Sequence, residues 1–127
     1  MRKISPTGGQ VWSFTQHTSS VQGVAVDNDL YVYTATYDES VTKISPSGSQ
    51  VWSFTQHTDS VQSFAVDSDG YVYTATYYNT VRKISPTGGQ LWSFTQHTSS
   101  VQGVALDEDG YVYTATYDES VTKISPS

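Results

Sequence analysis

Cysteine is absent from the 127-residue sequence, so neither a disulfide nor a thiolate metal site can form. Basic residues are few: six Lys and Arg stand against twelve Asp and Glu, and the net charge of −6 argues against nucleic acid, which selects a basic surface. No apolar run approaches the roughly 20 residues of a membrane-spanning helix, and the N-terminal MRKISPTGG lacks the apolar stretch of a signal peptide. We therefore expect a soluble protein with neither nucleic acid nor membrane as a partner, in a compartment that the sequence leaves open.

Helical periodicity is missing as well. No stretch carries apolar residues at helical spacing across two turns, whereas Tyr, Val and Thr follow one another in short runs. Aromatic residues make up 13% of the chain, and ten of them are tyrosines. Such residues favour strands, so the composition predicts an all-β protein.

A tandem repeat accounts for the whole chain. Trp12, Trp52 and Trp92 are 40 residues apart, and the surrounding WSFTQHT…YVYTATY recurs with each of them. We divide this single repeat domain, 1–127, into repeats 1–40, 41–80 and 81–120, followed by 121–127, a duplicated terminal strand that copies 1–7. The near-identity of the repeats is typical of a recently amplified or an engineered fragment, and the sequence leaves both origins open.

Each repeat predicts four short strands. In the first repeat these are 10–15, 21–27, 31–37 and 41–45, separated by polar turns such as the Asp-x-Asp-Gly hairpin signal. A four-stranded antiparallel meander with a period near 40 residues is typical of a β-propeller blade.

The segment HTxSVQxVAVDxDGYVYTATYD resembles the blade of WD-repeat propellers. The resemblance implies a structural hydrogen-bond network in which a histidine is bonded by a Thr hydroxyl and an Asp carboxylate. The residues at these positions are His17, His57, His97, Thr36, Thr116, Asp38 and Asp118. The sequence departs from the WD pattern because Gln precedes each histidine, Ile44-Ser45 replaces the Trp-Asp pair, and Tyr78 replaces the middle aspartate. The stretch VAVDSDGYVYTA is also similar to NHL-type and quinoprotein-type blades.

Three such blades cannot close a ring alone, because each would have to fill a 120° wedge and closed propellers use about four to eight blades. The outer repeats keep the apolar pattern of the middle one, so no polar cap is visible. We expect ring closure by homo-oligomerisation, with the chain itself as partner and a trimer favoured over a dimer because WD-like blades are flat, modest wedges. Segments 2–5 and 122–125 fit the same strand position, so one copy should be displaced.

Other site chemistry receives little support. Histidines 40 residues apart would lie on successive blades, so no metal site is expected. Asp67-Ser68-Asp69-Gly70 is similar to the start of a calcium loop, but a strand follows at once. Near-identical blades do not build one asymmetric catalytic or cofactor site, which also argues against a quinoprotein-like oxidoreductase. We expect no enzyme activity, no catalytic residue and no cofactor.

The aromatic residues allow two functions. We expect most of them to pack between blades, namely Trp12, Trp52, Trp92, Tyr33, Tyr73 and Tyr113. Tyr78 lies in a turn and has no counterpart in the other repeats, which makes it a candidate for contact with a ligand. The sequence thus favours a self-assembling structural and interaction scaffold that binds itself and presents loops to another protein. The alternative is a multivalent carbohydrate-binding, lectin-like propeller.

Overall fold

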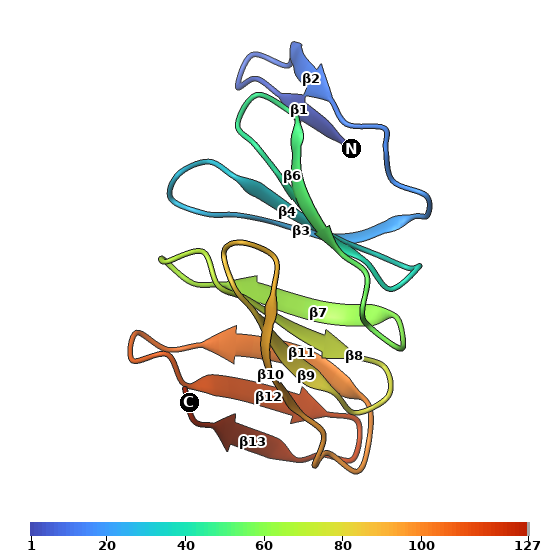
Figure 1. Ribbon diagram of the computed structural model, residues 1–127, viewed down its shortest axis with the longest axis vertical. Coiled ribbons are helices and arrows are strands. Elements are labelled where there is room, and N and C mark those ends of the chain that lie inside the picture. The colour runs from blue at the N-terminus through green and yellow to red at the C-terminus, as the bar shows by residue number, and fades with distance from the viewer. Residues whose placement is uncertain (127) are drawn as a thin grey trace.

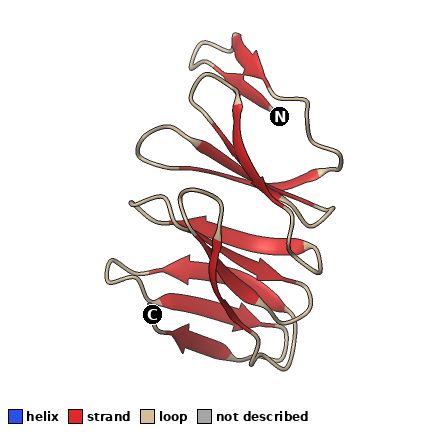
Figure 2. Cartoon of the chain, viewed as in Figure 1, coloured by secondary structure: helices blue, strands red, loops and turns tan. Residues whose placement is uncertain are grey.

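The structure, a computed structural model, describes residues 1–126, and every regular element in that range is a β-strand (Figure 2). Ser127, the last residue of the expected terminal segment 121–127, lies outside the described residues. Within residues 1–126, no helix is long and apolar enough to cross a membrane.

The strands form an N-terminal hairpin, two complete blades and one three-stranded blade. These parts follow one another in this order along the long axis of the molecule (Figure 1). Blade 1 contains β3 (Val21–Val26), β4 (Val32–Thr36), β5 (Val41–Ile44) and β6 (Gln50–Phe54). Blade 2 contains β7 (Val61–Val66), β8 (Val72–Thr76), β9 (Val81–Ile84) and β10 (Gln90–Phe94). Blade 3 contains β11 (Val101–Leu106), β12 (Val112–Thr116) and β13 (Val121–Ile124), and the N-terminal hairpin contains β1 (Arg2–Ile4) and β2 (Gln10–Ser13). The predicted all-β fold of antiparallel four-stranded sheets is confirmed, whereas the sheets do not close into a ring.

The blade boundaries are offset from the sequence repeats, because each sheet begins at the strand that follows the QHT loop. Blade 3 therefore ends at its third strand. The hairpin carries the sequences that form the third and fourth strands of blades 1 and 2, so β1 and β13 are two copies of the same strand.

The turn between the first and second strands of each blade is built around an aspartate. Oδ1 of Asp67 accepts hydrogen bonds from the backbone N–H groups of Asp69 and Tyr71, at 3.0 and 2.9 Å. Gly70 follows with φ of 82°, in the left-handed region where glycine is favoured. Leu30 occupies the same place in blade 1 with φ of 66°, and there the side chain adds strain.

Alternate residues of each strand face opposite neighbours, which is why the blades stack. From β4, Tyr33 and Ala35 point towards blade 2, and Val72 of β8 points back towards them in the same buried cluster. The next junction repeats this arrangement, with Tyr73 and Ala75 packed against Val112 of β12. The apolar cores therefore lie between the blades, and each blade needs a neighbour on both sides.

Candidate functional site

The junction between consecutive blades is the most regular site in the molecule. Tyr33 is fully buried and meets Trp52 edge to face, with ring centroids 6.1 Å apart. Tyr73 and Trp92 form the corresponding pair at 6.2 Å. Such aromatic pairs contribute about 0.5–1.5 kcal/mol beyond the area they bury.

The tryptophans also join neighbouring units by hydrogen bonds. Nε1 of Trp52, on blade 1, donates to the backbone oxygen of Pro86 in blade 2 at 2.8 Å. Trp12, on the N-terminal hairpin, donates to Pro46 of blade 1 at 3.0 Å. The hairpin therefore occupies the position of the two outer strands of a blade that would precede blade 1. The two inner strands of that preceding blade are not paired with the hairpin, which forms a two-stranded sheet.

One edge of each junction combines a carboxylate, two tyrosines and a lysine. Oδ2 of Asp67 accepts from the Tyr73 hydroxyl at 3.2 Å, and Lys83 Nζ lies 4.5 Å from the centre of the Tyr71 ring. Burial and the nearby Asp67 carboxylate raise the pKa of Tyr73, so this hydroxyl remains protonated. These contacts recur with the same numbering offset in the other blades.

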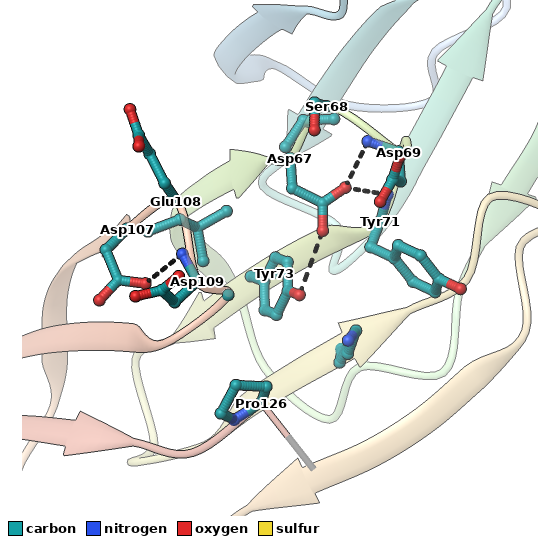
Figure 3. Close-up of a pocket in the computed structure, with 13 residues that line it drawn as sticks. Asp67, Ser68, Asp69, Tyr71, Tyr73, Asp107, Glu108, Asp109 and Pro126 are labelled. Atoms are coloured by element: carbon teal, nitrogen blue, oxygen red, sulfur yellow. Dashed lines mark hydrogen bonds between the residues drawn. The ribbon is translucent and has the colours of Figure 1, made fainter.

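Between blades 2 and 3 these groups border a cavity of about 530 Å³ (Figure 3). Asp67 and Asp107 are held by their turns and point their carboxylates at backbone N–H groups, while Asp69, Glu108 and Asp109 add further acidic side chains. Within the described part of the chain, no three His, Asp or Glu side chains lie close enough together to hold a metal ion. The cavity is thus an acidic groove between two turns.

The residues expected to form one His–Thr–Asp network lie in two separate groups of hydrogen bonds. Nε2 of His57 bonds Oγ1 of Thr74 at 2.8 Å, and the corresponding bonds join His17 to Thr34 and His97 to Thr114. Thr34 and Thr114 each lie two residues before Thr36 and Thr116, the threonines that the WD resemblance implied.

The other group contains the threonine and aspartate of the expected network, without the histidine. The hydroxyls of Thr18 and Thr36 both donate to the Asp38 carboxylate. These bonds lower the pKa of Asp38, because they favour the ionised carboxylate. In blade 3 the same arrangement, completed by Thr98 and Ser120, lowers the pKa of Asp118 to about 2. Tyr78 replaces the carboxylate in blade 2.

His57 is the most deeply buried histidine and packs edge to face on Phe54, with centroids 4.8 Å apart. Burial lowers its pKa to about 4, and the Arg82 charge acts in the same direction. His57 is thus a neutral imidazole with a hydrogen-bond partner at each ring nitrogen.

The first face of blade 1 is only partly covered, because the N-terminal hairpin supplies no strand in front of β3. Val21 is 37% exposed and Val24 61% exposed. Val61 and Val101, the counterparts of Val21 in blades 2 and 3, are 1% and 0% exposed because a preceding blade packs on them.

The last face of blade 3 is uncovered. Val121 is 74% exposed, whereas its counterparts Val41 and Val81 are completely buried against the following blade. Ala115 is also exposed, and Tyr113 is only half-buried. The two ends of the chain are thus the two halves of the junction that occurs twice inside it.

Sequence reasoning identified the tryptophans and the buried tyrosines of the junction, but it missed Asp27, Lys43 and their counterparts in the other blades. A signal was present, since Asp and Lys recur at intervals of 40 residues beside the Tyr-rich strand. Tyr78, the candidate for contact with a ligand, is 68% exposed, and Tyr117 is 79% exposed.

Comparison with solved structures shows the same fold. The WD40 β-propeller domain of Doa1 matches 94% of this chain at 19% identity with a TM-score of 0.84, and the match covers 41% of that chain. The computationally designed Ika4 protein matches 92% at 18% identity with a TM-score of 0.83, covering 72% of its length. U3-55K matches 87% at 23% identity with a TM-score of 0.80, and this chain spans 37% of its length. The prediction of propeller blades is confirmed.

None of the curated proteins matches the chain. The family described as outer membrane protein assembly factor BamB matches residues 37–127, which is more than two thirds of the sequence. The repeated blades, their junctions and this match lead to one assignment: the chain belongs to the family of the outer membrane protein assembly factor BamB.

Proposed function

We propose that the chain is a self-assembling interaction scaffold, in which several copies join head to tail into a closed ring of blades and no copy has a catalytic role. The propeller fold and the designed propeller neighbours support an interaction scaffold. The self-assembly rests on the two incompletely covered end faces.

The observation that carries the proposal is the change in exposure of equivalent valines. Val121 is 74% exposed at the end of the chain, while Val41 and Val81 are completely buried where a blade follows. Burying a valine side chain contributes about 1.5–3 kcal/mol, so two such faces placed in water favour association. Because the faces differ and are complementary, the contact is head to tail, and it ends when a ring closes.

A composite blade forms at each contact in this ring. Blade 3 of one copy supplies β11 and β12, and the hairpin of the next copy supplies β2 as the outer strand. The third strand is either β13 or β1. We favour three copies, which give nine narrow blades, over two copies.

The test is the mass in solution, by light scattering after size exclusion at about 10 μM, where a contact with micromolar Kd is occupied. We expect the mass of three copies of the 13.9-kDa chain. Two copies would correct the ring size and keep the self-assembly. A monomer would overturn the proposal.

Two charged substitutions show whether the end faces make the contact. We expect Val24→Arg and Ala115→Arg each to give a folded monomer, since both positions are exposed within one copy and would face the next copy in the ring. Val51→Arg is the matched control, because this valine is 50% exposed on an outer strand and contributes to no end face. Assembly that survives both end-face substitutions would contradict the proposed contact.

A further inference from the structure

A cavity of about 510 Å³ lies between blades 2 and 3, where the loops that leave β8, β10 and β12 come together with β7 and β11. Three tyrosines line it, Tyr77, Tyr78 and Tyr117, and each is at least half exposed. The rings of Tyr77 and Tyr78 are 5.4 Å apart and almost perpendicular, at 76°. They present apolar faces to solvent beside polar groups, which is the composition of a small-molecule site.

The polar groups of this cavity are uncharged and partly oriented. Gln62 and Gln102 donate through Nε2 to the hydroxyls of Ser60 and Ser100, at 3.1 and 2.9 Å. Their amide nitrogens are held on the loops, and the two carbonyl oxygens are left to accept hydrogen bonds from a ligand. Asn79 adds an amide that can donate and accept, and Ser99 adds a hydroxyl.

Only the middle blade provides this chemistry. At the position of Tyr78 the other blades carry Asp38 and Asp118, and at the position of Asn79 they carry Glu39 and Glu119. Asp59 occupies the position at the junction of blades 1 and 2 that Ser99 occupies at the junction of blades 2 and 3. Three substitutions thus remove three carboxylates from one junction, so that none of the eight residues lining the cavity is charged.

We propose that this cavity, the tyrosine pocket, binds a neutral oligosaccharide of two or three sugar units. The C–H faces of pyranose rings pack on the tyrosine rings, and the sugar hydroxyls donate to Gln62 and Gln102 while they accept from Asn79. The pocket is complete within one copy of the chain, so it does not depend on the assembly proposed above.

Two other occupants of aromatic pockets fit less well. A proline-rich segment offers carbonyl acceptors but almost no donors, which would leave the oxygens of Gln62 and Gln102 without partners. A quaternary ammonium group is attracted to tyrosine faces, but it is usually enclosed by them, and these three rings are largely exposed. An exposed aromatic platform with both donors and acceptors suits a sugar.

The test is saturation-transfer NMR with chitotriose, cellotriose and maltotriose, and with decaproline and choline as competing probes. We expect at least one trisaccharide to bind with a Kd between about 0.1 and 10 mM, as for a small open site. The double substitution Tyr78→Asp and Asn79→Glu should weaken binding at least about tenfold, or about 1.4 kcal/mol. Asp and Glu occupy these two positions in repeats 1 and 3, so the variant is expected to fold. The next residue differs, since it is Thr80 here and a serine in the other two repeats.

The converse substitution makes the test independent of any loss of structure. Asp38→Tyr, Glu39→Asn and Asp59→Ser together transfer the neutral pocket to the junction of blades 1 and 2, and titration should then give two sites per chain in place of one. Absence of binding by all three sugars at about 10 mM would overturn the proposal. So would sugar binding that the Tyr78→Asp, Asn79→Glu variant leaves unchanged, or binding of decaproline or choline alone.

Discussion

His57 is held in one tautomer by the two groups it contacts. Its Nδ1 lies 2.9 Å from the backbone oxygen of Glu39, which can only accept, so the proton belongs on Nδ1. Nε2 then accepts from the hydroxyl of Thr74. A second proton, on Nε2, would break that bond and place a charge in a buried site.

This arrangement makes stability depend on pH. The folded state takes up the proton of His57 only near pH 4, whereas an unfolded chain does so near pH 6.5, so the unfolded state binds more protons between these values. Stability should therefore fall as the pH drops from 6.5 towards 4, by an amount on the order of 3 kcal/mol for this residue. Urea denaturation at several pH values measures the effect.

His57→Gln is the informative variant, because glutamine does not titrate. We expect its free energy of unfolding to change less between pH 7 and pH 5 than that of the parent chain. His17→Gln is the matched control, since His17 is less buried and should contribute less to the slope. An identical pH slope in the parent chain and the His57→Gln variant would contradict the assignment.

Leu30 is a site of backbone strain. Its φ of 66° lies in a region that costs a residue with a side chain about 1–2 kcal/mol. Glycine avoids this strain, but it loses more conformational entropy on folding, which is a smaller effect of about 0.5–1 kcal/mol. We expect Leu30→Gly to raise the free energy of unfolding by about 0.5–1 kcal/mol. Gly70→Leu, at the equivalent turn, should lower it, and chemical denaturation at one protein concentration compares the two. Destabilisation by Leu30→Gly would show that the Leu30 side chain makes contacts worth more than the strain.

At the residue scale, the sequence predicted which side chains recur but not always which of them meet. The resemblance placed Thr36 beside the histidine, whereas Thr34 is there. Thr34 and Thr36 lie on the same face of β4, and the loop that carries His17 decides between them. The path of an irregular loop depends on packing, which the sequence pattern does not specify.

At the scale of the strand, the main feature is that β1 and β13 are two copies of the same strand. Both copies carry Lys-Ile, both pair with a neighbouring strand of their own, and a composite blade has room for one of them. We expect deletion of residues 1–5 alone, or of 121–127 alone, to leave the number of copies in the assembly unchanged. Deletion of both should abolish assembly, since β2 would then have no strand to pair with.

Light scattering of the three variants checks this expectation. Full assembly of the double deletion would show that the outer strand is not required, and loss of assembly in either single deletion would show that the two copies are not interchangeable.

Strand positions were predicted well because two local signals coincide. Alternation of Val, Tyr and Thr identifies β4, and Asp-x-Asp turns mark its start, so the expected range 31–37 differs from Val32–Thr36 by one residue at each end. The contact of Lys43 with Tyr31 was not predicted, although Lys43 pairs with Tyr33 across β4 and β5. That register becomes visible only when the sheet is built.

At the scale of the whole molecule, the blades and the tyrosine pocket do not repeat together. Blades repeat every 40 residues, but the tyrosine pocket occurs once in three blades. In a three-copy ring the pockets would lie at three evenly spaced places on one rim, and a branched glycan reaching two of them would gain avidity without any further contact. The repeat was evident in the sequence, whereas the proximity of Tyr78 and Gln102 depends on how the blades stack.

The duplicated strand also affects how a closed ring would exchange one subunit for another. With a single copy of the strand, a contact between two chains opens only when all its pairings are lost at once. With two copies, the unpaired one acts as a toehold: it binds an incoming chain first and then displaces its duplicate step by step. Rings of this chain would therefore exchange subunits through strand invasion, at a rate set by competition between two nearly identical segments rather than by complete dissociation.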